Sequence, residues 1–192
     1  MEIAFITSNK AKVKLANERL NRYGIAVVQR ELELIEPQTL DVVEVVTKKA
    51  EQAERVVDTS FIVEDSGLYI NGLNGFPGAL MKPVLDSIGD SGILKMMSKV
   101  RDRKVLVRSV LAYCNPKSKQ IESFTGLYHG RLAETAAGAD SRGWKVSRIF
   151  IPDGADKTLA EMDDEEWKEF LEEFRKDDHY EKFGSWFEAN KD

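Results

Sequence analysis

The stretch Phe61–Leu68 constrains the fold most, because it joins an apolar, largely β-branched run to two acidic residues. Three apolar residues are followed directly by Glu64 and Asp65 and then by a Ser-Gly pair. This order predicts a buried strand whose C-terminal end presents a carboxylate and a tight turn to a cleft, where open α/β sheets bind ligands. Because side chains alternate along a strand, only one of the acids should face the cleft. We expect it to be Asp65, which lies next to the turn.

The order of apolar segments predicts a mixed α/β protein that opens with a β–α–β unit. Asn71-Gly72 predicts a type I′ hairpin turn, and the small polar segment 134–143 predicts a mobile loop. We expect strands over 3–6, 25–28, 61–64, 104–115, 120–132 and 144–151, and helices over 10–23, 40–57, 91–100, 163–174 and 180–190. The expected fold is one domain over residues 1–192, with a mixed twisted sheet, flanking helices and two lobes around a central cleft.

Composition limits the classes of function. Of the 192 residues, 42% are hydrophobic and 32% are charged, as in ordinary globular proteins. The formal net charge of −5 argues against a general nucleic-acid-binding protein, which usually has a basic surface. The first residues predict a strand and not a signal peptide, and no apolar run approaches the roughly 20 residues of a membrane span. Cys114 is the only cysteine, so it can form no disulfide within the chain. We therefore expect a cytoplasmic protein that binds neither nucleic acid nor a membrane.

Several common catalytic arrangements are missing from the sequence. His129 and His179 lack the spacing to a cysteine or a second histidine that a zinc site needs. No Ser-His-Asp or Cys-His arrangement and no P-loop motif is recognisable. The candidate chemistry therefore depends on carboxylates and on the polar segments that follow the strands.

The first of these segments is Thr7-Ser8-Asn9, which leads from the first strand into a helix that carries Lys12. A strand–turn–helix junction exposes backbone N–H groups at the positive end of the helix dipole and so predicts an anion site. Thr7 and Asn9 can donate side-chain hydrogen bonds to phosphate, and Lys12 adds a positive charge. A simple helix cap would give the same pattern.

The second candidate is a pair of acids, Glu36 in a loop and Asp65 at the expected strand end. Two carboxylates from separate strand ends can hold one Mg²⁺ ion that also takes phosphate oxygens. Water polarised by the metal beside Asp65 would be a nucleophile for attack on phosphorus. Lys49, on the helix predicted over 40–57, is placed to reach phosphates. An ordinary turn aspartate and a solvated helix lysine remain alternatives for Asp65 and Lys49.

Taken together, these motifs resemble the inosine triphosphate pyrophosphatase family. The resemblance begins with T-S-N-K-A-K at 7–12, E-P-Q at 36–38, V-E-D-S-G-L at 63–68 and L-N-G-F-P-G-A at 73–79. It continues with F-T-G at 124–126, G-R-L at 130–132, I-F-I-P-D-G at 149–154 and K-T-L-A-E-M at 157–162. The motifs occur in the family's order and span about residues 1–162.

The resemblance implies a two-lobed homodimeric enzyme with its active site between the lobes. It implies Mg²⁺-dependent hydrolysis of a nucleoside triphosphate to the monophosphate and pyrophosphate. By position, the triphosphate would be held by Thr7, Ser8, Asn9 and Lys12, with Lys49, Ser66 and Gly67 at the phosphates or the sugar. Glu36 and Asp65 would bind the metal, and Asp65 would also be the general base.

The sequence departs from the family in the part that recognises the base. Trp144 keeps an aromatic side chain for stacking, but Ser147 stands where the family has an aspartate. The family's Ser-His-Arg segment has no clear counterpart, and the nearest candidates are Arg175 and His179-Tyr180. Three hypotheses follow: a pyrophosphatase for dITP, ITP or XTP, a pyrophosphatase with broad or altered base preference, and a nucleotide-binding protein without catalysis.

Overall fold

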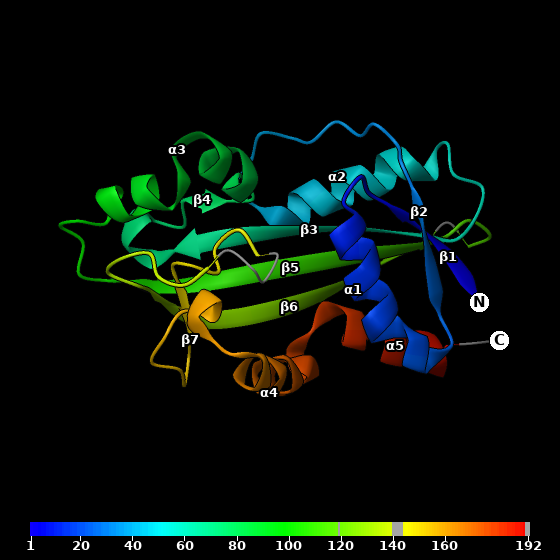
Figure 1. Ribbon diagram of the computed structural model, residues 1–192. Helices are drawn as coiled ribbons and strands as arrows, with labels where there is room; N and C mark the ends of the chain where they lie inside the picture. The colour runs from blue at the N-terminus through cyan, green and yellow to red at the C-terminus, as the bar shows by residue number, and fades with distance from the viewer. Residues whose placement is uncertain (119, 140–143, 191–192) are drawn as a thin grey trace. The chain divides into compact units, whose positions relative to one another are not determined.

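The computed structural model of the chain describes residues 1–118, 120–139 and 144–190 (Figure 1). The strands are β1 (Glu2–Ile6), β2 (Ala26–Arg30), β3 (Phe61–Ile70), β4 (Pro77–Gly78), β5 (Lys104–Asn115), β6 (Gln120–Leu132) and β7 (Phe150–Pro152). The α-helices are α1 (Lys10–Leu20), α2 (Val42–Glu54), α3 (Met81–Met96), α4 (Asp164–Phe174) and α5 (His179–Ala189). Within the described ranges, no helix is both long and apolar enough to cross a membrane.

These elements form one mixed sheet, as the sequence predicts, and the sheet has seven strands among the described residues. The hydrogen-bonded strand order is β2-β1-β3-β5-β6-β7, and β4 pairs with β3. Backbone contacts divide the chain into two compact units. Unit 1 contains Met1–Asp65, Ser109–Gly126 and Lys176–Asp192, and unit 2 contains Ser66–Arg108 and Leu127–Arg175. Each unit has its own hydrophobic core, whereas the predicted cleft between lobes stays a prediction.

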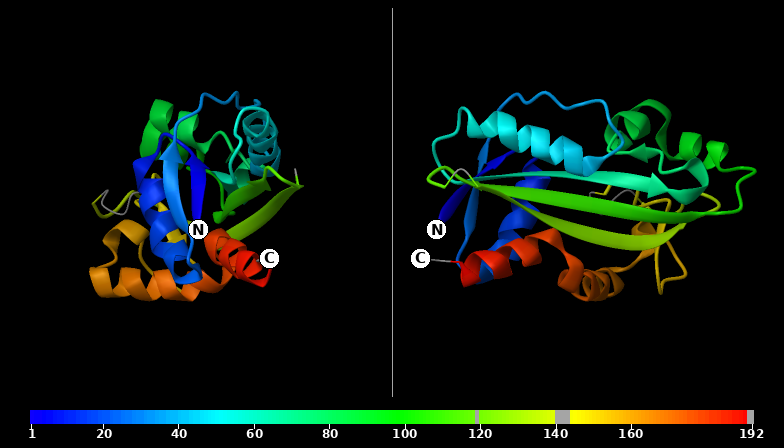
Figure 2. Two further views of the ribbon diagram at one scale, coloured as in Figure 1. Left: turned by 90° about the vertical axis from the view of Figure 1, so that its right-hand side faces the viewer. Right: turned by 180° about the vertical axis from the view of Figure 1, so that it is seen from behind.

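Unit 1 is built on the β–α–β segment at the start of the chain. Strand β1 lies between β2 and β3 and is parallel to both, with Ile3 opposite Val27 and Phe5 opposite Ile62. Helices α1 and α5 pack side by side in every view (Figure 2). Their apolar faces and the strands enclose a core that includes Phe5, Leu20, Ile62, Tyr180 and Phe183. The core holds α1 through Ala16 and Leu20, and the N-terminal end of the same helix carries the predicted anion-binding segment.

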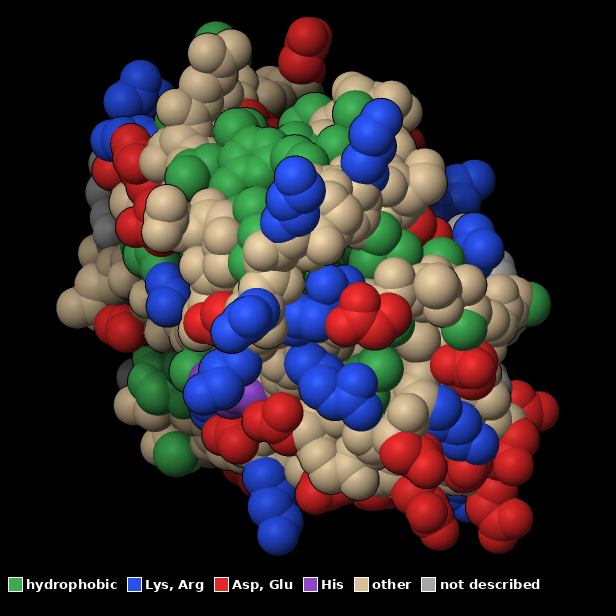
Figure 3. All heavy atoms as spheres, turned by 90° about the vertical axis from the view of Figure 1, so that its left-hand side faces the viewer, with side chains coloured by type: hydrophobic (Ala, Val, Ile, Leu, Met, Phe, Trp, Pro, Cys, Tyr) green, Lys and Arg blue, Asp and Glu red, His purple; other side chains and the backbone are tan. Residues whose placement is uncertain are grey.

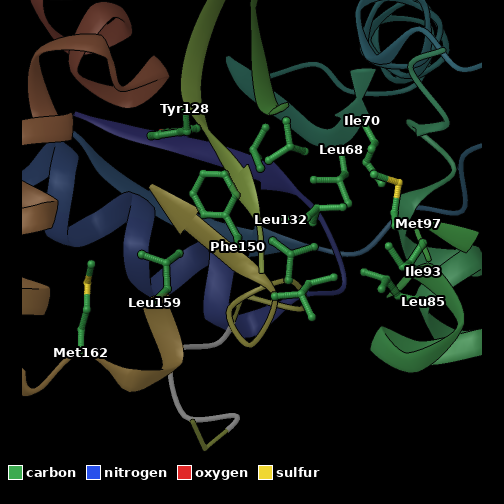
Figure 4. Close-up of a cluster of buried hydrophobic side chains, with 14 of the residues drawn as sticks. Leu68, Ile70, Leu85, Ile93, Met97, Tyr128, Leu132, Phe150, Leu159 and Met162 are labelled. Atoms are coloured by element: carbon green, nitrogen blue, oxygen red, sulfur yellow. The ribbon is translucent and has the colours of Figure 1, made fainter. Parts of the chain in front are cut away.

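Unit 2 has its core between α3, α4 and the sheet. Figure 4 shows Leu68 and Ile70 from β3 in one cluster with Phe150 from β7 and Ile93 from α3. Antiparallel pairing of β7 with β6 places Phe150 opposite Leu132. The cluster consists of apolar side chains, and their removal from water stabilises unit 2.

The predicted end of β3 is wrong, because the strand continues through the acidic pair to Ile70. The Ser-Gly pair was expected to make a turn, but both residues are extended within β3. The reason for the glycine is a close approach of β4: a Cβ atom at Gly67 would lie 3.0 Å from the carbonyl carbon of Gly78. Asp65 therefore lies in the middle of a strand and not at its end.

Three other predicted elements also differ. Asn71–Leu73 forms a 3₁₀ turn instead of a two-residue hairpin, and β4 pairs with β3 only at Pro77–Gly78. Helix α3 begins ten residues before the predicted start, with Pro83 in its first turn, where proline is tolerated, and with a break at Gly89 (φ 63°). The strand predicted over 144–151 is reduced to Phe150–Pro152, because turns occupy the preceding residues.

The other helices lie close to their predicted positions, with ends that differ by a few residues. The N-terminal cap of α2 is Asp41, and that of α4 is Asp163, which forms a capping box with Glu166. Of the mobile loop predicted over 134–143, residues 134–139 have no helix or strand, and residues 140–143 lie outside the described residues.

Candidate active site

The polar segment after β1 caps helix α1. Asn9 is the N-cap, and its Oδ1 accepts hydrogen bonds from the backbone N–H groups of Ala11 (3.0 Å) and Lys12 (3.4 Å). Thr7 Oγ1 accepts a hydrogen bond from the N–H of Asn9 at 3.1 Å. Ser8 and Asn9 are exposed. The simple cap is thus present in the structure, and the exposed positive end of α1 also remains suited to an anion.

Asp65 lies in a charged cluster with Lys49 and Glu36. Lys49 extends from α2, and its Nζ donates to Asp65 Oδ2 at 3.0 Å and to Glu36 Oε1 at 2.9 Å. The side chains of Lys49, Asp65 and Glu36 are 13%, 22% and 58% exposed, respectively. Burial alone would lower the pKa of Lys49, but the two carboxylates outweigh it and raise that pKa above its ordinary value. Lys49 is therefore a charged ammonium that links the two predicted metal ligands.

Glu64 forms a second cluster on the opposite face of β3, in agreement with the predicted alternation. Its carboxylate is 4% exposed and lies 2.8 Å from Lys12 Nζ and 4.0 Å from His179 Nε2. Burial would lower the pKa of Lys12, but the charges of Glu64 and Asp65 raise it overall. Each acid of the pair is thus matched with a lysine from a different helix, and Asp65 also acts electrostatically on Lys12.

Sequence reasoning set Glu64 aside and named His179 only as a candidate for recognition of the base. The structure buries His179 at the first position of α5, and burial lowers its pKa, so the imidazole is neutral near pH 7. Neither ring nitrogen has a hydrogen-bond partner among the described residues. A Cβ atom at Gly126 would lie 3.0 Å from the backbone nitrogen of His179, which explains the glycine of F-T-G. That contact spans more than fifty positions, so no local pattern could reveal it.

Three of the residues predicted to contact the sugar or the base, Ser66, Gly67 and Trp144, lie in unit 2. Ser66 and Gly67 follow Asp65 directly along β3. Trp144 is half-buried and packs edge-to-face on Tyr128 and Trp167, with ring centroids 5.4 and 6.5 Å away. Ser147 is fully buried, and its hydroxyl has no hydrogen-bond partner among the described residues. Ser147 is therefore directed into the protein in this structure.

Glu36 and Asp65 fit a divalent cation. Both supply carboxylate oxygens, and both lie within 3.0 Å of one positively charged nitrogen, so the space between them already accommodates positive charge. Over 1–118, 120–139 and 144–190, no group of three or more His, Cys, Asp or Glu side chains could hold a metal. Mg²⁺ commonly takes only one or two carboxylates and completes its shell with water and phosphate oxygens. Glu36 and Asp65 could therefore supply two of the oxygen ligands of a Mg²⁺ ion.

The sequence and the fold are both similar to those of known proteins. The sequence matches the Ham1 family over residues 3–174. It is 37% identical over 190 residues to a dITP/XTP pyrophosphatase of Methanopyrus kandleri, covering 99% of this chain and 98% of that protein. It is 32% identical over 165 residues to an inosine triphosphate pyrophosphatase of Yarrowia lipolytica, covering 86% of this chain and 87% of that protein. The solved structure of the Staphylococcus aureus Ham1 protein matches with a TM-score of 0.81 at 21% identity and covers 100% of both chains.

The chain belongs to the Ham1 family. The resemblance to the inosine triphosphate pyrophosphatase family is thereby confirmed, and so is the mixed α/β fold. The roles of the individual site residues remain predictions, although the structure brings Glu36, Lys49 and Asp65 into one cluster.

Proposed function

We propose that the protein hydrolyses the non-standard purine nucleotides dITP, ITP and XTP to the monophosphate and pyrophosphate, with Mg²⁺ as cofactor, and so removes them from the nucleotide pool. The observation that carries the proposal is the cluster of Glu36, Lys49 and Asp65 in a Ham1-family chain. The two relatives, a dITP/XTP pyrophosphatase and an inosine triphosphate pyrophosphatase, support the same reaction.

In this proposal the N-terminal end of α1 binds the triphosphate. Thr7, Ser8 and Asn9 supply hydrogen-bond donors there, and Lys12 supplies a positive charge. Glu64 holds the ammonium of Lys12 in place through the 2.8 Å ion pair. Lys49 of α2 contacts phosphate or sugar oxygens, and so do Ser66 and Gly67 of β3.

The chemical step is attack of water on a phosphorus atom of the triphosphate. Glu36 and Asp65 would hold Mg²⁺, which when bound polarises the phosphate and lowers the pKa of bound water. The Asp65 carboxylate accepts the proton of the attacking water. The bond between that phosphorus and the oxygen that bridges to the next phosphate then breaks, and pyrophosphate leaves.

Release of pyrophosphate from ITP, dITP and XTP with and without Mg²⁺ tests the proposal. We expect Asp65→Asn to lower kcat by about 10²- to 10⁴-fold, the range for loss of a general base. Unfolding curves of the variant show whether the loss is catalytic. Full turnover by the folded variant would contradict the assignment of Asp65.

The buried Ser147 favours a second candidate, the same reaction with broad or altered base preference. A serine directed into the protein cannot replace the base contact of an aspartate, and each lost buried contact is worth about 1–3 kcal/mol of discrimination. The values of kcat/KM for ITP, XTP, GTP, ATP and modified pyrimidine triphosphates decide between the two. A preference of several hundredfold for ITP and XTP over both GTP and ATP would exclude the second candidate.

We further propose that the protein is a cytoplasmic homodimer. Ile88 and Met96 of α3 are large apolar side chains that are exposed in the single chain. Figure 3 shows a face on which hydrophobic side chains gather, and such patches often mark contacts between proteins. Light scattering of the purified protein measures the mass directly, and a monomer at micromolar concentration would contradict the proposal.

A further inference from the structure

Glu36 lies on a segment that has little structure of its own. Residues 31–41 contain no helix or strand, and most of their side chains are exposed. The side chain of Ile35, directly before Glu36, is 79% exposed. Apolar burial therefore contributes little to fixing the main chain at Ile35, although a metal ligand needs a well-defined position.

Gln52 of α2 supplies a polar attachment at this point. Its Oε1 accepts a hydrogen bond from the N–H of Ile35 at 2.9 Å, and its Nε2 donates to the carbonyl oxygen of Ile35 at 2.7 Å. A side-chain amide thus pairs with both polar groups of one residue, as a neighbouring strand would do. Nε2 also donates to the carbonyl oxygen of Lys48 at 3.0 Å, which fixes the amide relative to the helix.

Gln52 and Lys49 act on the same short segment. They are three residues apart on α2, so their side chains leave the helix on neighbouring positions of one face. Gln52 binds the main chain of Ile35, and Lys49 binds the side chain of Glu36. Since Lys49 also binds Asp65, side chains of helix α2 contact both the segment that carries Glu36 and the second predicted metal ligand.

We propose that Gln52 is a positioning residue that holds Glu36 at the distance from Asp65 that a divalent cation requires. This inference rests on the proposed function, because it assumes that Glu36 and Asp65 bind the metal. The amide is suited to the role because one planar group offers a donor and an acceptor. Glutamate would lose the donor, and an apolar side chain would lose both.

The test uses Gln52→Met, which keeps the length of the side chain and its helix propensity but removes both hydrogen bonds. The matched control is Glu51→Ala, which removes the exposed ion pair with Lys48 on the same helix. The first readout is binding of Mn²⁺ alone, as a paramagnetic substitute for Mg²⁺, followed by electron paramagnetic resonance. The second is the Mg²⁺ concentration that gives half-maximal pyrophosphate release from ITP.

Removal of a side chain that orients a metal ligand typically lowers metal affinity or activity by about 10- to 100-fold. We expect Gln52→Met to weaken Mn²⁺ binding and to raise the half-saturating Mg²⁺ concentration by about tenfold, with kcat largely recovered at high Mg²⁺. Glu51→Ala should leave both values unchanged. The melting temperatures without metal should be similar for all three proteins.

Unchanged Mn²⁺ and Mg²⁺ dependence in Gln52→Met would overturn the inference. So would a loss of kcat that Mg²⁺ cannot recover, accompanied by a lower melting temperature, since that result indicates a structural role. If the wild-type protein binds no Mn²⁺, the inference also fails. If it binds Mn²⁺ in a Gln52-dependent way but hydrolyses no triphosphate, the positioning role stands and the proposed function fails.

Discussion

Replacing Lys49 by methionine removes the ammonium that Glu36 and Asp65 both contact. An exposed ion pair contributes about 0–1 kcal/mol to stability, whereas breaking a fully buried pair costs about 3–5 kcal/mol. The free-energy cost of breaking the contact between Lys49 and Asp65 lies between these limits, because the two side chains are 13% and 22% exposed. The contact with Glu36 adds little, because Glu36 is 58% exposed. We therefore expect Lys49→Met, in EDTA, to have a free energy of unfolding about 2 kcal/mol below that of the wild type. The melting temperature should fall by about 4–8 °C.

Mg²⁺ should reverse part of this loss. In the variant, two carboxylates repel each other without a cation between them, so the metal gains a site free of competition from an ammonium group. A ligand at ten times its dissociation constant stabilises the folded protein by about 1.4 kcal/mol. Thermal unfolding of wild type and Lys49→Met, with EDTA and with increasing Mg²⁺, measures both effects. We expect Mg²⁺ to raise the melting temperature of the variant more than that of the wild type.

The neighbouring Lys48→Met is the matched control, because Lys48 forms an exposed pair with Glu51 on the same helix. Its expected cost is below about 0.5 kcal/mol. The reasoning is refuted if Lys49→Met is as stable as Lys48→Met in EDTA, or if Mg²⁺ stabilises wild type and Lys49→Met equally.

Two further predictions concern the cluster on the other face of β3. Glu64→Gln should lower the free energy of unfolding, measured in urea, by about 1–3 kcal/mol, because it leaves Lys12 without its buried carboxylate. In steady-state kinetics it should raise KM for ITP more than it lowers kcat. An unchanged KM would count against a role of Glu64 through Lys12. Burial lowers the pKa of His179 in the folded state. Below about pH 6.5 the imidazole is therefore protonated in the unfolded chain but stays neutral in the folded chain, so the free energy of unfolding should decrease as the pH falls. Between pH 7.5 and 5.5 the wild type should lose about 1 kcal/mol more than His179→Gln, and equal losses in urea titrations would refute the prediction.

The sequence predicted the parts of the fold that depend on local patterns. The β–α–β start and helices α2, α4 and α5 follow from apolar periodicity. The path of β3 was mispredicted because Ser66-Gly67 has the composition of a turn, whereas Gly67 serves the close approach of Gly78. Helix α3 was placed too late because Pro83 and Gly89 are typical of loops and because its first half is held by the core of unit 2.

In the candidate site, too, local patterns predict some features and tertiary packing decides the others. Glu36, Lys49 and Asp65 were chosen from motifs and residue types, and the structure places them in one cluster. The pairing of Lys12 with Glu64 could not be predicted, because it depends on how α1 packs on β3. The contact of Gln52 with Ile35 and the burial of His179 also arise from tertiary packing and leave no local pattern.

The most direct test of the central claim is product analysis of ITP hydrolysis by phosphorus NMR. With Mg²⁺, the wild-type protein should convert ITP to IMP and pyrophosphate, and folded Asp65→Asn should do so at least about a hundredfold more slowly. Formation of IDP and inorganic phosphate, or equal rates for the two proteins, would contradict the assignment of a pyrophosphatase centred on Asp65.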